Sequence, residues 1–151
     1  MVDEKAGKEV SVFKVAAYTT LGMIVFFFLM KLVGLVTVVE LRFFNFIILF
    51  FGIRYVLVES RKANNGKLEY LKGMMTGFMT GIYTAVFFSF FICLYLFFDL
   101  SFMEYLKVSQ PFGTYLTPGS AALVSFIEDI SGGAIIAFAL MHLLNKDDDR
   151  G

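Results

Sequence analysis

The chain has 151 residues, of which 58% are apolar and 20 are Phe, and its 13 basic residues balance its 13 acidic ones. Soluble domains are less apolar than this, and the zero net charge argues against a nucleic-acid partner. The single Cys and single His exclude a disulfide framework and any site built from several such ligands.

Four apolar segments are each long enough to cross a bilayer, which takes about 20 residues in a helix. They cover about 15–35, 41–58, 73–98 and 118–144. The sequence therefore predicts an all-α polytopic membrane protein, a single domain over residues 1–151 with four transmembrane helices in two hairpins. No small-x-small cleavage motif follows the first segment, so we expect it to be retained as a helix.

The third segment carries small residues at every fourth position. In lipid, helices associate by close backbone approach, which small residues in register permit. Four-residue steps overshoot a helical turn by about 40°, so we expect two neighbouring helices to share this row. A second row of small residues, which includes an acid, runs along the fourth segment. The two rows are Gly73, Gly77, Gly81, Ala85, Ser89 and Cys93, and then Ala121, Ser125, Asp129, Gly133 and Ala137.

The connection between the third and fourth segments predicts a short helix on the outer membrane surface. Asp99 is expected to end the third segment at the interface. Ser101 and Glu104 then have capping-box spacing, and apolar residues follow, which predicts an interfacial helix over about 102–109. Thr117 followed by Pro118 is typical of an N-cap and a first helical residue.

Basic residues in the short loops predict the orientation of the chain. Lys and Arg concentrate in the N-terminal segment, the central loop and the C-terminal tail, whereas the opposite side has only Lys31, Arg42 and Lys107. Cytoplasmic loops carry an excess of basic residues, so both termini and the central loop are expected in the cytoplasm.

Glu128 and Asp129 are the sharpest chemical feature, because they lie about ten residues, or 15 Å, into the fourth segment. A charge at hydrocarbon depth costs at least about 2.5–3.5 kcal/mol, so these acids must be paired, protonated or hydrated. One interpretation is a structural carboxyl that fixes helix register. The other is a proton or cation site.

Other polar residues of the apolar segments have expected positions. Arg42 with Glu40 and Asn45 forms a polar group on the same side as the acids, and an Arg42–Glu128 ion pair is the preferred hypothesis. Lys31 and Arg54 are expected to reach lipid headgroups. No cofactor or metal is expected, because consecutive acids such as those at 147–149 bind divalent ions poorly without a scaffold.

Several stretches resemble a family of small four-span bacterial membrane proteins known only as a domain of unknown function and common in Bacteroidota-type genomes. The matching stretches are 41–45, 68–73, 102–106 and 126–133, within a region of about 15–146. In that family's pattern a glycine follows the acid, where this chain has Asp129. The resemblance implies a fold and an inner-membrane location, but no activity.

Function is expected to be non-enzymatic, because the sequence contains no phosphate-binding loop, no paired His and no nucleophile with a base. The first hypothesis is a structural or accessory subunit that packs in the bilayer with itself, as a homo-oligomer, or with a larger membrane complex. The alternative is a small oligomeric channel or a proton- or ion-coupled transporter that uses the intramembrane carboxylates.

Overall fold

In the computed structural model, residues 11–34, 43–109 and 113–148 are described, and their secondary structure is helical. The elements are α1 (Val12–Leu32), α2 (Phe43–Ala63), α3 (Tyr70–Phe98), α4 (Leu100–Ser109), a 3-10 turn η2 (Gly113–Tyr115) and α5 (Pro118–Asp148). Four of these helices are long and apolar enough to cross a membrane. This confirms the predicted all-α polytopic fold.

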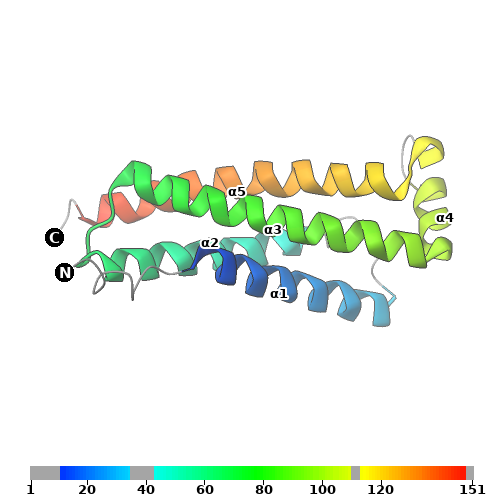
Figure 1. Cartoon of the computed structure of the whole chain (residues 1–151), viewed down its shortest axis with the longest axis horizontal. Coiled ribbons are helices and arrows are strands. Elements are labelled where there is room, and N and C mark those ends of the chain that lie inside the picture. The colour runs from blue at the N-terminus through cyan, green and yellow to red at the C-terminus, as the bar shows by residue number, and fades with distance from the viewer. Residues whose placement is uncertain (1–10, 35–42, 110–112, 149–151) are drawn as a thin grey trace, which may run out of the picture.

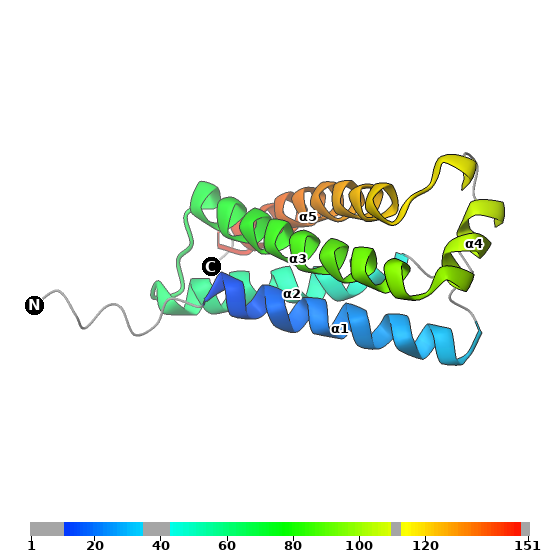
Figure 2. The ribbon, with the colours of Figure 1, turned by 45° about the vertical axis from the view of Figure 1, so that its right-hand side comes forward.

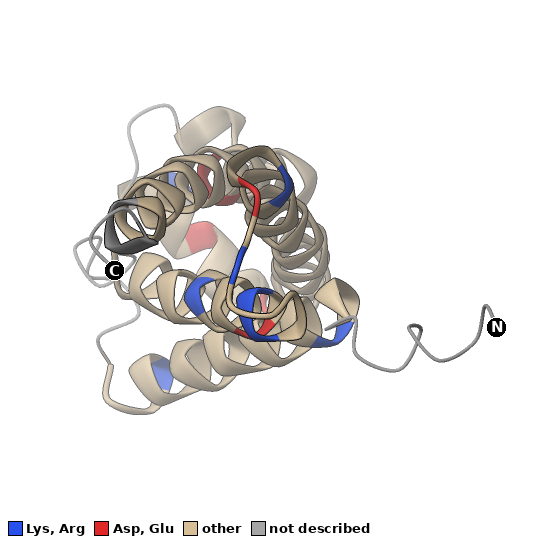
Figure 3. Cartoon of the chain, turned by 90° about the vertical axis from the view of Figure 1, so that its left-hand side faces the viewer, with Lys and Arg blue, Asp and Glu red and all other residues tan. Residues whose placement is uncertain are grey.

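The four long helices lie along one axis, and α3 is central (Figures 1 and 2). The pairs α1–α2 and α3–α5 form two hairpins, and α3 also packs on α1 and α2. The α3–α5 contact is the most extensive. We call the end with α4 the outer end and the end with the α2–α3 connection the inner end, after the predicted orientation. Basic and acidic segments lie on that connection (Figure 3).

Helix bounds differ from the predicted segments where helical hydrogen bonding continues past the apolar residues. The second predicted segment stops at 58, whereas α2 continues through an ion pair between Glu59 and Lys62, 2.7 Å apart, to Ala63. The turn after it contains Asn65 and Gly66, both with positive φ, 57° and 83°. Hydropathy marks the bilayer crossing, but only the left-handed turn ends the helix.

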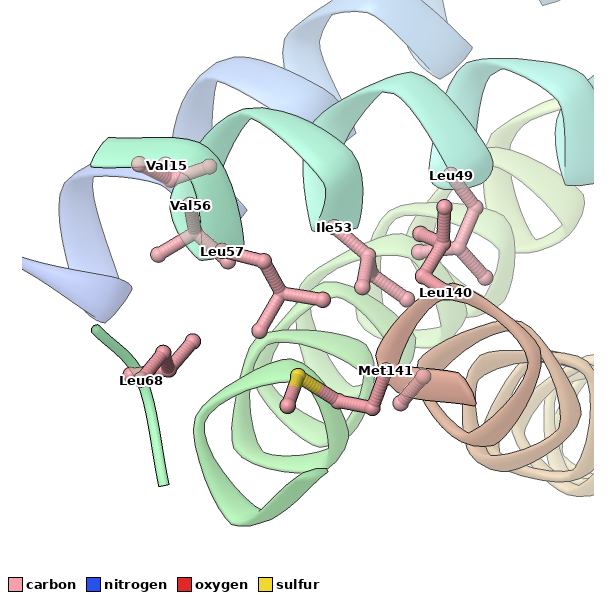
Figure 4. Packing of buried hydrophobic residues seen from close by; sticks show 9 residues of the cluster. Val15, Leu49, Ile53, Val56, Leu57, Leu68, Leu140 and Met141 are labelled. Carbon is pink, nitrogen blue, oxygen red and sulfur yellow. The ribbon is translucent and has the colours of Figure 1, made fainter. Parts of the chain in front are cut away.

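The buried core lies between α2, α3 and α5, and α1 closes one side. Leu49, Ile53, Val56 and Leu57 of α2 are fully buried and point toward Met141 of α5 and the α2–α3 connection (Figure 4). In the most apolar stretch of each long helix, only 22–28% of the residues are buried by other parts of the protein. The remaining apolar surface needs lipid to cover it, because no soluble monomer exposes this much.

The predicted short outer helix is present, but it begins two residues before the predicted start at about 102, because Asp99 and not Ser101 caps it. The Phe102 N–H donates to Asp99 Oδ1 at 3.0 Å, and α4 begins at Leu100. A carboxylate that directly follows α3 thus accepts a hydrogen bond from one of the free N–H groups of α4 without any linker. At the start of α5 the predicted cap is confirmed, because the Ser120 N–H donates to Thr117 Oγ1 at 3.1 Å.

Candidate functional site

The two rows of small residues lie against each other in the α3–α5 interface. A Cβ added to Gly77 would lie 2.9 Å from Ala137 Cβ, and one added to Gly81 would lie 3.2 Å from Gly133 Cα. Gly73 meets Met141 in the same way. The contacts therefore advance by four residues toward the C-terminus of α3 and by four residues toward the N-terminus of α5, as expected for antiparallel helices. This register brings the backbones as close as glycine allows.

Helix α2 completes two layers of this interface. A Cβ on Gly77 would lie 3.1 Å from Ile53 Cγ2, and one on Gly133 would lie 3.8 Å from Leu49 Cδ2. Two neighbours, α5 and α2, thus share the α3 row, as its four-residue steps predicted. One layer consists of Gly77, Ile53 and Ala137, and the next consists of Gly81, Leu49 and Gly133.

Extending this register by one further step of four toward the outer end places Asn45, Ala85 and Asp129 at a common level, which we call the polar layer. Ala85 is fully buried and Asp129 is 5% exposed. The amide oxygen of Asn45 is also buried, and it accepts no hydrogen bond from the described part of the chain. Ala85 is one residue from the midpoint of α3. The polar layer therefore lies near the middle of the bilayer.

The interface differs on the two sides of the polar layer. On the inner side, the atoms nearest to Gly81 and Gly77 belong to Gly133, Ala137 and Ile53, and the hydroxyl of the buried Thr80 donates to its own helix. On the outer side, the same register continues to Ser89 and Ser125, and Ser125 is 8% exposed. Polar groups thus extend from the layer toward the outer end, while tightly packed apolar groups separate it from the inner end.

Glu128 does not share the environment of Asp129. It lies one residue earlier on α5, about 100° round the helix, and its side chain is exposed at the surface of the bundle. Arg42 and Glu40 fall outside the described residues, so the Arg42–Glu128 pair stays a prediction. Of the expected polar group, the structure thus brings Asn45 and Asp129 to one level and leaves Glu128 on the surface.

A second polar group, the outer cluster of Lys31, Tyr95 and Asp99, joins α1 to the end of α3. Lys31 Nζ lies 2.6 Å from Asp99 Oδ2, and the Tyr95 hydroxyl donates to the same oxygen at 2.6 Å. Lys31 also donates to the Tyr95 oxygen and lies 4.8 Å from the centre of its ring. Hydrogen bonds from Lys31, from Tyr95 and from the Phe102 N–H, in that order, hold the pKa of Asp99 well below its ordinary value.

Sequence reasoning placed Lys31 at the lipid headgroups and missed this cluster. The available signal was that both Lys31 and Asp99 were expected at the outer interface with opposite charges. The sequence does not reveal that α1 packs against α3. In the structure, Phe27 of α1 packs edge-on to Tyr95 of α3, with ring centres 4.9 Å apart. Arg54 is exposed on α2, and its contact with headgroups stays a prediction.

Among the described residues, the chemistry available at the level of the polar layer is that of the buried Asp129 carboxyl and the Asn45 amide. Within the described residues, no three His, Cys, Asp or Glu side chains group closely enough to hold a metal ion. Hydroxyls near the interface bond to their own helices. Thr80 and Thr84, for example, donate to the carbonyls four residues earlier at 2.9 and 2.8 Å. Asp129 is therefore the side chain of this layer that can be either a carboxylate or a neutral carboxylic acid.

Comparison with protein-family models matches residues 14–111 to a family described as "Protein of unknown function (DUF4199)". The match runs from α1 to the end of α4, which is shorter than the region of 15–146 that the resemblance implied. It therefore does not include α5 or Asp129. Searches of curated proteins and of solved structures found no match.

Proposed function

We propose a function on the basis of this chain's own residues. The chain belongs to the DUF4199 family, whose description names no function. The proposal is a non-enzymatic, multi-pass protein of a bacterial inner membrane, with both termini in the cytoplasm. It acts as a structural or accessory subunit and packs with a second copy or with a larger membrane complex.

The observation that carries this proposal is the position of Glu128. It is exposed on α5 about 15 Å along the helix from Pro118, and ionisable side chains at such a depth usually face protein or water rather than acyl chains. The glycine row of α5 is already used by α3, so a partner must use the opposite face. That face carries Ile127 and Ile135, which are 55% and 69% exposed. A protein partner there would shield the acid from lipid.

Cysteine cross-linking in native membranes tests this proposal. With Cys93→Ser as background, we expect Ile127→Cys and Ile135→Cys to give cross-linked products, either at twice the monomer mass or with a second protein. Tyr18→Cys on α1, 74% exposed, is the matched control and should stay monomeric. Adding Glu128→Lys should abolish the products. Monomer at both α5 positions, or equal yields at all three sites, would reject a subunit role for this face.

The alternative function, a small oligomeric channel or proton- or ion-coupled transporter, is favoured by the polar layer. Asp129 is buried near mid-bilayer, with serines on its outer side and close-packed apolar layers on its inner side. The polarity of this arrangement favours the approach of a proton or a small cation from the outer side over the inner side. Transport through the whole bundle would require the Gly81 layer to open.

Flux measurements in liposomes test the alternative. Asp129→Asn should abolish proton or cation flux while leaving the melting temperature close to that of the wild type, because asparagine has nearly the same volume. Glu128→Gln tests whether the surface acid contributes, and Glu104→Gln on the exposed face of α4 is the control. Flux that is unchanged in both Asp129→Asn and Glu128→Gln would eliminate this function.

A further inference from the structure

A groove opens on the surface of the bundle near its inner end, along the first turns of α3. Its volume is about 650 Å³, within the range of small-molecule sites. Leu71, Met75, Met79 and Tyr83 of α3 form its apolar lining, and Val12 of α1 closes one side. Methionine side chains are flexible and polarisable, which suits an occupant of irregular shape.

The groove exists because α1 covers α3 only from its fourth turn onward. Phe13, at the start of α1, packs edge-on to Tyr83 and Phe87, with ring centres 6.0 and 5.2 Å apart. The part of α3 before Tyr83 extends past the start of α1 toward the inner end (Figure 1). Among the described residues, α1 therefore leaves this face of α3 uncovered toward the inner end of the bundle.

Two opposite charges lie at the mouth of the groove. Glu69 precedes α3 and Lys72 lies three residues later, so both belong to the same turn. Glu69 makes no side-chain hydrogen bond to its own helix end. Within the described ranges, neither Glu69 nor Lys72 forms an ion pair with another side chain. Both charges thus remain available to a ligand that carries an anion and a cation close together.

We propose that this groove binds one phospholipid whose headgroup carries a primary ammonium, such as phosphatidylethanolamine. The phosphate contacts Lys72, the ammonium contacts Glu69, and one acyl chain lies over Met75 and Met79. From Glu69 to Tyr83 the groove extends over fourteen residues of α3, about 21 Å at 1.5 Å each, whereas one leaflet of hydrocarbon is about 15 Å deep. The length therefore accommodates an acyl chain and its headgroup.

Charge complementarity distinguishes this lipid from other occupants. An anionic lipid would satisfy Lys72 but would be repelled by Glu69, and a quaternary ammonium cannot donate a hydrogen bond to that carboxylate. The chain's own residues 1–10 include five charged side chains, which suits a methionine-lined floor poorly. The proposal uses only the membrane-spanning fold and does not depend on the proposed subunit function.

Native mass spectrometry of the delipidated full chain tests this proposal, with phosphatidylethanolamine, phosphatidylglycerol and phosphatidylcholine of identical acyl chains added in equal amounts. We expect the ethanolamine lipid to be bound about two- to fivefold more than either competitor, the ratio that corresponds to one exposed ion pair. Glu69→Gln should remove that preference, and Lys72→Gln should weaken binding of all three lipids. Lys67→Gln in the preceding turn is the matched charge control.

Filling the groove separates lipid binding from a general effect of charge. Met79→Trp should abolish binding of the ethanolamine lipid, while Leu94→Trp, at a similarly exposed position further along α3, should leave it unchanged. Equal binding of the three lipids, or retained binding in Met79→Trp, would overturn the proposal. If Met79→Trp removes a dimer that the wild type forms, the occupant of the groove is a second copy of the chain. If deletion of residues 2–10 strengthens lipid binding, the occupant is the N-terminal segment.

Discussion

Gly81 is the position at which the α3–α5 packing can be tested most directly. Its added Cβ would lie 3.2 Å from Gly133 Cα and 3.6 Å from the Gly133 carbonyl carbon, both of which are backbone atoms. Backbone cannot rotate away as a side-chain end can. Any carbon added at this position must therefore move the two helices apart.

The size of the added side chain sets the expected cost. For Gly81→Ala the helices must separate by a few tenths of an ångström, and about 1 kcal/mol of improved helix propensity offsets part of that strain. We therefore expect a change within about 1 kcal/mol. Gly81→Leu adds three more carbons against backbone, so we expect a loss of about 3 kcal/mol or more, at the upper end of overpacking costs.

Reversible unfolding in bicelles, followed by a denaturant titration or by steric trapping, measures these free energies. Val86→Leu is the matched control, because Val86 lies on the same helix and is 43% exposed, so its extra carbon points to lipid. We expect the control to lie within about 0.5 kcal/mol of the wild type. If Gly81→Leu unfolds at the same point as Val86→Leu, the register derived for the α3–α5 interface is wrong.

Three further predictions address other contacts. Asp99→Asn should lower the melting temperature at neutral pH. The pKa of Asp99 is depressed in the folded chain, so ionised Asp99 stabilises the fold above its ordinary pKa of 3.8, and this stabilisation is lost as pH falls through the lowered pKa. The variant should therefore lose less stability than the wild type on acidification. Identical dependence of the melting temperature on pH in the two proteins would count against the outer cluster. A Cβ on Gly132 would lie 2.3 Å from Phe46 Cε1, so Gly132→Ala should cost about 1 kcal/mol less in a Phe46→Ala background than in the wild type, whereas additive costs would contradict an α2–α5 contact there. A green fluorescent protein fused to the C-terminus should fluoresce in cells, while a periplasmic phosphatase at the same position should stay inactive; the reverse result would invert the proposed orientation.

Apolar length and composition alone determined the fold class. A bilayer leaves a chain with four long apolar segments no option but helices, since every backbone polar group must be bonded within its own segment. The small residues at every fourth position likewise identified packing faces, because close approach in lipid needs little more than the absence of side chains. The cap at Thr117 could also be read from the sequence, as its hydrogen bonds are local.

The tertiary structure decided which faces meet. Both small-residue rows were evident in the sequence, but only the tertiary structure shows that Gly81 faces Gly133. Extending that register by four residues on each helix puts Asp129 level with Ala85. Spacing along a helix fixes the angle at which a residue projects but carries no information about which neighbour lies there. Lys31 and Asp99 are 68 residues apart, and their ion pair exists because α1 and α3 pack side by side and bring the ends of these two helices together.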